Sequence, residues 1–438
     1  MSDAVDPHPT EPIGPRTNSC ATELVCRDCG YRTPLLDTAF KCPACGEGLD
    51  IDYDYERARE LIAERSPQER PWNIWRFEEL LPIVSRRAQS KVAAFAGKTP
   101  LIHAERLGAE LGLSNLYIKD DSSNRPSFSY KDRVVGMAIA RLLELGKDEV
   151  GCVSTGNVGT AVAALAAQAG ATPYIFYPGN MEKGKAKACR ALGAQVIQLD
   201  ANYDGANRAC RELAVTNGME FANITLRPFY AEGAKTMGFE VVEELGWKAP
   251  DHFVIPAAGG TLSSRVHKGL VELEKVGLAE TAGCKINIAQ ASGCSPIVTA
   301  ILGGGELTSV APETAAHSLA IGAPGDGNLV LDAVRTRGGS AAAASDEEIF
   351  GAIDLLAETE GILTEPAGGT TIASTARLAQ EGRIGPDETV VAIISGNGLK
   401  TLQEHPDKPW PEMVPCEVGA MEEMLNDFRQ AAAAATLR

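Results

Sequence analysis

From about residue 90 onward, short runs of apolar and β-branched residues alternate with longer, Ala-rich amphipathic runs. This pattern predicts strands at 150–154, 173–178, 194–200 and 252–256, a further strand within 388–398, and a helix near 203–217. Such alternation is typical of α/β proteins, in which helices cover both faces of parallel sheets. Because ligands of these folds bind at the carboxyl ends of the strands, we expect the functional site there.

The chain has 438 residues, which is more than one hydrophobic core usually supports. The first segment, 1–18, is polar and Pro-rich and is predicted to be a flexible tail. A small segment at 19–50 precedes the main body at 51–405, in which we expect a smaller subdomain near 120–235 and a larger one formed by the remainder. Residues 406–438 are predicted to form a C-terminal helical tail.

Composition excludes several classes of partner. The chain is 44% hydrophobic and 23% charged, and no run of about eighteen apolar residues could span a bilayer. The net charge of -17 argues against nucleic acid, because phosphate contacts need clustered Lys and Arg. The N-terminus does not follow the pattern of a signal peptide, so we expect a cytoplasmic protein. A small anionic ligand stays open, since local cations and N–H groups outweigh a distant global charge.

Four cysteines form two CxxC knuckles twelve residues apart: Cys26, Cys29, Cys42 and Cys45. Four thiolates satisfy tetrahedral Zn²⁺ and leave no open position for water, so we predict a zinc-ribbon-like segment whose metal is structural. A ribbon that persists without metal and a redox role are the alternatives. The other cysteines show no framework spacing and are expected to be reduced thiols.

Gly-rich loops follow the predicted strands at 154–157, 257–261, 365–370 and 395–398. One such loop alone is more often a turn than a ligand site, because Gly simply permits positive φ. Several of them at strand ends predict one shared cleft. The loop at 257–261 opens a helix, whose free N–H groups suit a bound phosphate.

One motif resembles the phosphate loop of an NTPase without completing it. Residues 179–185 follow a strand and end in Gly-Lys, but Ala186 stands where a magnesium-binding Ser or Thr is needed. We therefore reject an NTPase. The run Lys183, Lys185 and Lys187 is interpreted as a solvated helix face.

The segment DDSSNRPSFSYKDR at 120–133 leads into an amphipathic helix and is the most specific motif in the chain. It resembles the threonine synthases, and the resemblance continues through 97–101, 154–157, 226–233, 267–269, 293–296 and 395–400. It covers roughly residues 70–405. The resemblance implies a type II pyridoxal-phosphate fold, with two doubly wound domains and the cofactor in the cleft between them, and it implies a homodimer.

The resemblance also implies the roles of individual residues. Lys131 would carry pyridoxal 5'-phosphate as a Schiff base and move protons as general base and acid. The other cofactor contacts it implies are Asn157 beside the ring oxygen, Ser395 facing the pyridine nitrogen, and Gly259, Gly260 and Thr261 around the phosphate. The substrate contacts it implies are Ser154 and Thr155 for the carboxylate, and Thr225, Arg227, Lys235 and Thr155 for the substrate phosphate.

The implied reaction converts O-phospho-L-homoserine and water into L-threonine and phosphate by γ-elimination and β-hydration, the chemistry of a carbon–oxygen lyase. Tyr130 stands where the family usually has Phe, Ser127 where Thr is usual, and the loop at 257–261 reads AAGGT. These departures leave open a cysteate synthase-like reaction on phosphoserine or a threonine dehydratase-like reaction. A zinc-ribbon binding protein that has lost activity is the remaining alternative.

Overall fold

The computed structural model describes residues 16–37, 40–154, 156–179, 183–401 and 416–436. The chain divides into two compact units, Met1–Thr401 and Leu402–Arg438. The second unit contains one long helix, α15 (Val418–Thr436), in the range predicted to be helical. Most of the predicted tail at 1–18 and the start of the one at 406–438 lie outside the described residues.

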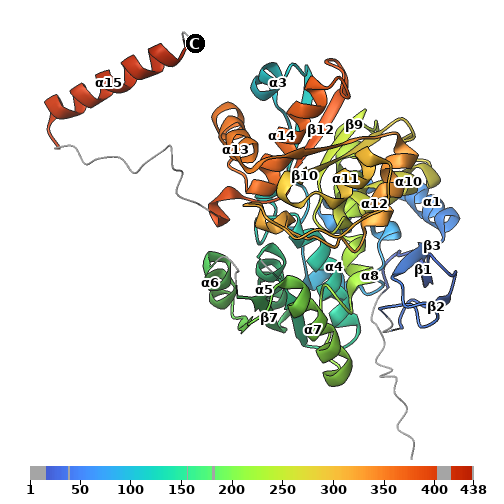
Figure 1. Cartoon of the computed structure of the whole chain (residues 1–438). Coiled ribbons are helices and arrows are strands. Elements are labelled where there is room, and N and C mark those ends of the chain that lie inside the picture. The colour runs from blue at the N-terminus through green and yellow to red at the C-terminus, as the bar shows by residue number, and fades with distance from the viewer. Residues whose placement is uncertain (1–15, 38–39, 155, 180–182, 402–415, 437–438) are drawn as a thin grey trace, which may run out of the picture. The chain divides into compact units, whose positions relative to one another are not determined.

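A six-stranded sheet with the strand order β11-β10-β9-β12-β5-β4 is the largest layer of the first unit (Figure 1). Its strands are β4 (Leu101–His103), β5 (Asn115–Asp120), β9 (His252–Pro256), β10 (Lys285–Ala291), β11 (Ala341–Ala344) and β12 (Thr389–Ile394). Neighbouring strands are parallel, except that β4 runs antiparallel to β5. β9 and β12 are central and are buried along almost their whole length, as expected for strands that are covered on both faces.

A second, parallel sheet has the order β6-β7-β8. Its strands are β6 (Glu149–Val153), β7 (Thr172–Pro178) and β8 (Gln195–Leu199), and the helices that follow them are α5 (Asn157–Ala169), α6 (Lys183–Ala191) and α7 (Tyr203–Asn217). All of these elements lie within the range predicted for the smaller subdomain. The prediction of parallel α/β layers is confirmed, whereas the subdomain boundaries stay a prediction.

The remaining helices pack around these sheets. They are α1 (Tyr55–Glu64), α2 (Arg86–Lys91), α3 (Glu105–Leu111), α4 (Lys131–Glu144), α8 (Arg227–Glu232), α9 (Lys235–Glu244), α10 (Thr261–Lys275), α11 (Pro296–Gly303), α12 (Gly327–Arg337), α13 (Asp346–Glu360) and α14 (Pro366–Gln380). Nearly every residue of α4 is buried, because α5 and α8 both pack against it. The approach of α8 is so close that a Cβ at Gly233 would lie 2.3 Å from the carbonyl oxygen of Arg133. That position therefore needs Gly.

The N-terminal segment forms a small antiparallel sheet from β1 (Ala21–Cys26), β2 (Arg32–Pro34) and β3 (Leu49–Tyr53), which we call the ribbon. β3 continues past the predicted end at residue 50. The ribbon is joined to α8, α9 and α10 by a buried group of charges that we call the ionic cluster: Asp50, Glu232, Lys235, Arg265, Lys268 and Glu272. Tyr53 of the ribbon donates a hydrogen bond of 2.7 Å to Glu232.

Among the described residues, no helix is both long enough and apolar enough to cross a membrane.

Candidate active site

A cavity of about 620 Å³ lies where strands and helices of both sheets meet. The predicted site residues that line it are Lys131, Ser154, Asn157, Arg227, Gly259, Gly260, Thr261 and Ser395. Ser154 directly follows β6 and Ser395 directly follows β12, so the cavity lies at the carboxyl ends of strands, where the sequence pattern predicts it. Residues that are far apart in sequence are thus brought together in one place.

Lys131 is the first residue of α4 and extends its ammonium group into this cavity. Lys131 Nζ donates a hydrogen bond of 2.5 Å to the hydroxyl group of Tyr130, which also lines the cavity. The backbone N–H of Tyr130 donates to the carbonyl oxygen of Ser395 over 2.9 Å. The start of α4 is therefore tied to the end of β12, which holds Lys131 and Ser395 at the same site.

Arg133 holds the start of α4 in place through buried ion pairs and does not line the cavity. Its guanidinium group is fully buried and donates to Asp121, over 2.6 and 2.9 Å, and to Glu240, over 2.7 and 2.8 Å. Two carboxylates compensate this cation and its hydrogen bonds are well formed, which is the condition under which a buried charge is tolerated. Arg133 is thus a structural residue.

Asn157, the first residue of α5, is oriented by the buried carboxylate of Glu365, which also pairs with Lys185. Its side-chain N–H donates to Glu365 over 2.7 Å, and Glu365 also lies 3.3 Å from Lys185 Nζ. The side-chain oxygen of Asn157 is buried and has no hydrogen-bond partner among the described residues. Lys185 is only 4% exposed, so the interpretation of 183–187 as a solvated helix face is wrong at this position. The pattern of charges alone did not reveal that α6 turns this Lys inward.

Ser154 shapes the loop that leads from β6 into α5. Its hydroxyl oxygen accepts hydrogen bonds from the backbone N–H groups of Gly156, at 2.9 Å, and Gly159, at 2.8 Å. These bonds fold the loop back over the first turn of the helix, where free N–H groups favour anions. Thr155, the other residue predicted for the substrate carboxylate, lies outside the described residues.

The loop 257–261 runs from β9 into α10, as predicted. Gly260 is the N-cap of α10 with a φ of 92°, and an added Cβ would lie 2.7 Å from Val330 Cγ2. Gly is therefore required both by the backbone conformation and by the close packing. Thr261 begins α10, and its hydroxyl group donates to Asp326 over 2.7 Å. This cradle of backbone and hydroxyl groups at a helix N-terminus fits a phosphate group.

Arg227 lines the cavity on the same side as this cradle. It donates to Asp326 over 2.6 Å and to the Thr261 hydroxyl over 3.2 Å. Asp326 in turn raises the pKa of the Arg227 guanidinium above its usual value. Burial acts to raise the pKa of the Asp326 carboxyl, but Arg227 outweighs it and holds that pKa below its usual value. Both groups are therefore charged at neutral pH.

Two of the predicted substrate contacts are not at the cavity, and these assignments are corrected. Lys235 has no exposed surface; its ammonium group donates to the carbonyl oxygen of Leu80 over 2.7 Å and pairs with Glu232, at 2.5 Å, and Glu272, at 2.9 Å. Thr225 donates to Glu220 over 2.6 Å. Its hydroxyl oxygen accepts from the backbone N–H of Phe221 over 2.8 Å. Charge and hydroxyl chemistry suggested these residues, but both are used to hold the scaffold.

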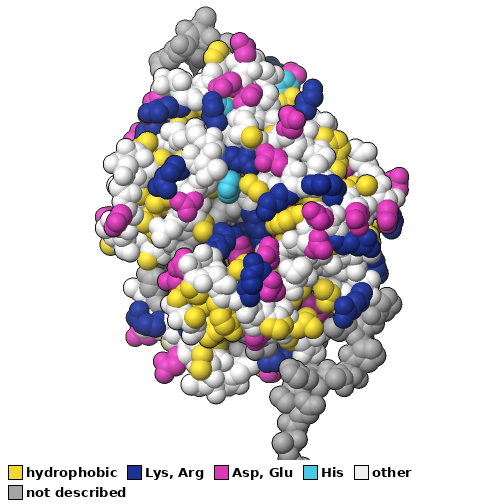
Figure 2. Space-filling view, turned by 90° about the vertical axis from the view of Figure 1, so that its right-hand side faces the viewer, with side chains coloured by type: hydrophobic (Ala, Val, Ile, Leu, Met, Phe, Trp, Pro, Cys, Tyr) yellow, Lys and Arg dark blue, Asp and Glu magenta, His cyan; other side chains and the backbone are white. Residues whose placement is uncertain are grey.

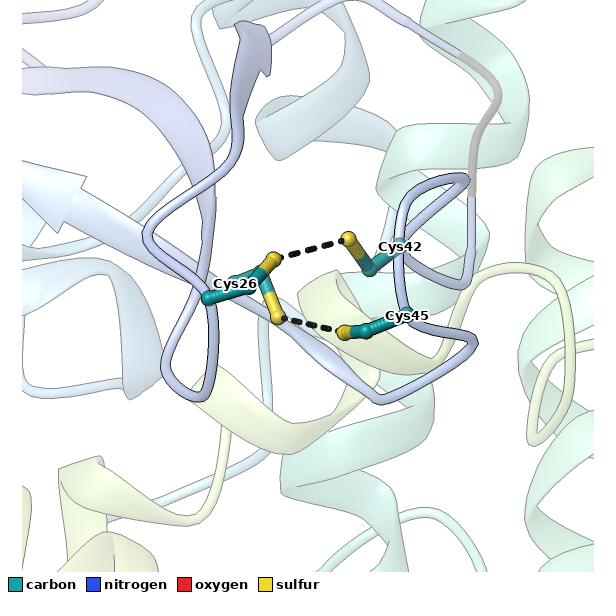
Figure 3. A group of neighbouring side chains, drawn as sticks. Cys26, Cys42 and Cys45 are labelled. Atoms are coloured by element: carbon teal, nitrogen blue, oxygen red, sulfur yellow. Dashed lines mark hydrogen bonds between the residues drawn. The ribbon is translucent and has the colours of Figure 1, made fainter.

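The four knuckle cysteines converge within the ribbon. Their sulfur atoms all lie within 4.8 Å of one another, and the pairs Cys26–Cys45 and Cys29–Cys42 are 3.5 Å apart (Figure 3). A tetrahedral zinc ion with Zn–S bonds of 2.3 Å separates its sulfur ligands by about 3.8 Å, so the arrangement fits this metal. Loss of solvent acts to raise the pKa of Cys42, but the N–H groups of Cys45 and Ala44 lower it to about 7. The backbone N–H groups of Tyr31 and Glu47 act to lower the pKa values of Cys29 and Cys45, but hydrogen bonds with the other thiols outweigh them, so both pKa values are raised instead. The arrangement of the four sulfur atoms is therefore what fits the metal.

Several residues of the cavity were not predicted from the sequence. From α7 these are Tyr203, Asn207, Arg208 and Arg211, and from the ribbon they are Phe40, Lys41, Gly46, Glu47 and Gly48. The sequence predicts only a helix near 203–217 and a small segment at 19–50 that precedes the main body. No signal within either stretch indicates that it reaches a site centred on Lys131, because only tertiary packing joins them.

Comparisons with known proteins show which proteins this chain is similar to. A family model described as "Pyridoxal-phosphate dependent enzyme" matches residues 92–396. The threonine synthase of Methanocaldococcus jannaschii is 34% identical over 413 residues, covering 92% of this chain and 99% of that protein. The threonine synthase of Methanosarcina acetivorans is 34% identical over 406 residues, covering 92% and 98%. Among solved structures, the processed threonine deaminase isoform 2 of Solanum lycopersicum matches with a TM-score of 0.59 and 25% identity, covering 70% of this chain and 81% of that chain.

Proposed function

Because this chain belongs to the pyridoxal-phosphate-dependent enzymes, and within them to the threonine synthase family, we propose that it converts O-phospho-L-homoserine and water into L-threonine and phosphate. The single observation that carries this proposal is the cavity that joins Lys131 to Asn157, Ser395 and the N-terminus of α10. These are the groups that the family resemblance requires, and they lie on four different elements. The type II fold predicted from the sequence is confirmed by the family match.

The residues present fit the cofactor. Lys131 would hold it covalently, and the N-terminus of α10 with Thr261 would bind its phosphate. The unpaired buried oxygen of Asn157 and the hydroxyl of Ser395 are available for its ring. When bound, pyridoxal phosphate supplies an electron sink for negative charge that develops on the substrate carbons.

Lys131 is the proposed general base and acid. Its amine would take one proton from Cα and one from Cβ as the phosphate leaves from Cγ, and would return one proton to Cγ and one to Cα. Water supplies the hydroxyl group at Cβ, and its remaining proton goes to the released phosphate. The hydroxyl group of Tyr130, 2.5 Å from Lys131 Nζ, lies close enough to exchange a proton with this amine. A neutral amine is needed for each abstraction, so a neighbour that both accepts and donates protons suits the task.

The substrate is proposed to bind through its two anionic ends. Ser154 and Thr155, with the N-terminus of α5, are proposed for the carboxylate. Arg227 is the predicted phosphate ligand that lines the cavity, and its charge is shared with Asp326. Thr225 and Lys235 have no place in this scheme.

The test is product analysis. Purified protein supplied with pyridoxal phosphate and O-phosphohomoserine is expected to release phosphate and threonine in equal amounts. Lys131→Ala should abolish both products, whereas Lys187→Ala, an exposed control, should leave both unchanged. Release of neither product by the cofactor-loaded protein would refute the proposal. The same assay with phosphoserine plus sulfite, and with threonine alone, tests the two alternative reactions.

We also propose a cytoplasmic homodimer. None of the eleven cysteines, all of which lie among the described residues, forms a disulfide, which supports a reducing compartment. The dimer rests on the family resemblance, and sedimentation of the cofactor-loaded protein tests it.

A further inference from the structure

The second cysteine knuckle forms part of the wall of the active-site cavity. Phe40, Lys41, Gly46, Glu47 and Gly48 line the same cavity as Lys131 and Ser395. A metal site that only stabilises the fold does not need to lie beside the active-site cavity. The position of this loop in the cavity wall therefore suggests that the loop also contributes to the active site.

The backbone of the knuckle is held in a closed turn. The N–H of Cys42 donates to the carbonyl oxygen of Glu47 over 2.8 Å, and the N–H of Gly46 donates to the carbonyl oxygen of Cys42 over 2.8 Å. Lys41 pairs with Gly48 in a β-bridge. Lys41 directly precedes Cys42, whose place in the cysteine cluster Figure 3 shows, so the packing of the four cysteines fixes the backbone next to Lys41.

Cations from two elements face the cavity here. On the face of the molecule seen in Figure 2, Lys and Arg side chains are interspersed with Asp and Glu side chains. Lys41 comes from the knuckle and Arg208 from α7, and both line the cavity. Neither forms an ion pair with another described residue, in contrast to Arg227, which is paired with Asp326 at 2.6 Å. Glu47 also lines the cavity, so the knuckle brings one charge of each sign.

We infer that the cysteine knuckle is a substrate-binding element, in which Lys41, together with Arg208 of α7, binds the phosphate group of the substrate. This inference rests on the proposed function, since it names the anchor for the anionic end of that substrate. A phosphate dianion is bound best by several cations that carry free N–H donors. The positive charge of Arg227 is already compensated by its ion pair with Asp326, so Arg227 is not sufficient by itself. A metal held by Cys26, Cys29, Cys42 and Cys45 would then stabilise the loop that carries Lys41 as well as the ribbon.

The test uses the cofactor-loaded enzyme and two ligands, O-phosphohomoserine and inorganic phosphate. Lys41→Ala is expected to raise KM at least about tenfold, equal to about 1.4 kcal/mol, while kcat changes less than about threefold. Calorimetry should show the same weakening of the Kd for inorganic phosphate, and Arg208→Ala should act likewise. Lys41→Arg should restore binding to within about threefold. Arg32→Ala, an exposed cation of the ribbon outside the cavity, is the matched control.

Zinc content and Tm are measured for every variant, because an altered fold would also weaken binding. Lys41→Ala protein that keeps its zinc and its Tm, yet binds phosphate as the wild type does, would overturn the inference. Wild-type enzyme that binds no phosphate at millimolar concentrations would overturn it too. If the wild type binds phosphate through Lys41 but does not turn over O-phosphohomoserine, the proposed function fails and the anion site stands.

Discussion

Replacement of Lys235 by Met tests whether this residue belongs to the scaffold or to the substrate site. Its ammonium group has no exposed surface and is held by Glu232 and Glu272 of the ionic cluster. Burial lowers the pKa of Lys235, while the two carboxylates act to raise it. Removal of one partner from a buried ion pair leaves charge uncompensated and costs about 3–5 kcal/mol.

The expected change in Tm follows from the size of the unit. The first unit, Met1–Thr401, has an unfolding entropy of about 0.8 kcal/mol/K, at about 2.1 cal/mol/K for each residue. A loss of about 3–5 kcal/mol therefore lowers Tm by roughly 4–6 °C. Differential scanning calorimetry of the cofactor-loaded protein measures this, with the exposed Lys248→Met as a control expected to stay within about 1 °C. An unchanged Tm with a raised KM would refute the reasoning and return Lys235 to the substrate site.

The remaining predictions concern the cavity, a buried His and the metal. Gly260→Ala should weaken cofactor binding at least about tenfold in an absorbance titration and cost about 1–3 kcal/mol of stability, since its Cβ meets Val330. Tyr130→Phe introduces the residue that the family usually has at this position, so kcat should change less than about tenfold, while its pH profile should shift because the hydroxyl beside Lys131 is lost. Burial, with Arg337, lowers the pKa of His267 to about 4. Since this pKa lies below that of His in the unfolded chain, the stability contributed by neutral His267 is complete above about pH 6.5. It falls as the pH drops toward 4, by at most about 3 kcal/mol. The free energy of unfolding of His267→Gln, measured by urea titration, should lack this dependence on pH. A chelator that strips the four ribbon cysteines of metal should lower Tm and raise KM.

Motifs that combine a backbone requirement with a chemical one were predicted well from the sequence. Gly260 is needed for its positive φ, and the loop around it opens a helix, so local rules alone lead to a phosphate cradle. Lys131 was identified by its motif, and its place at the start of a helix agrees with the amphipathic run that follows it.

Predictions based on the charge of a single residue were less reliable. Lys185 and Lys235 carry the same charge as any surface Lys, but tertiary contacts bury each of them against carboxylates. Only the folded chain shows which Lys meets a partner of opposite charge. The role of Lys41 in the cavity was equally out of reach, since the contact joins the ribbon to residues far along the chain.

The ionic cluster limits how far the chain can be truncated from its N-terminus. A deletion that ends within β3 would remove Asp50 and leave three buried cations, Lys235, Arg265 and Lys268, facing two carboxylates. Second-site changes on α10 would be needed before such a truncated protein became stable. The ribbon and the charged residues of α10 are therefore expected to occur together or to be absent together in related chains. A chimaera that contains one without the other should fail to express.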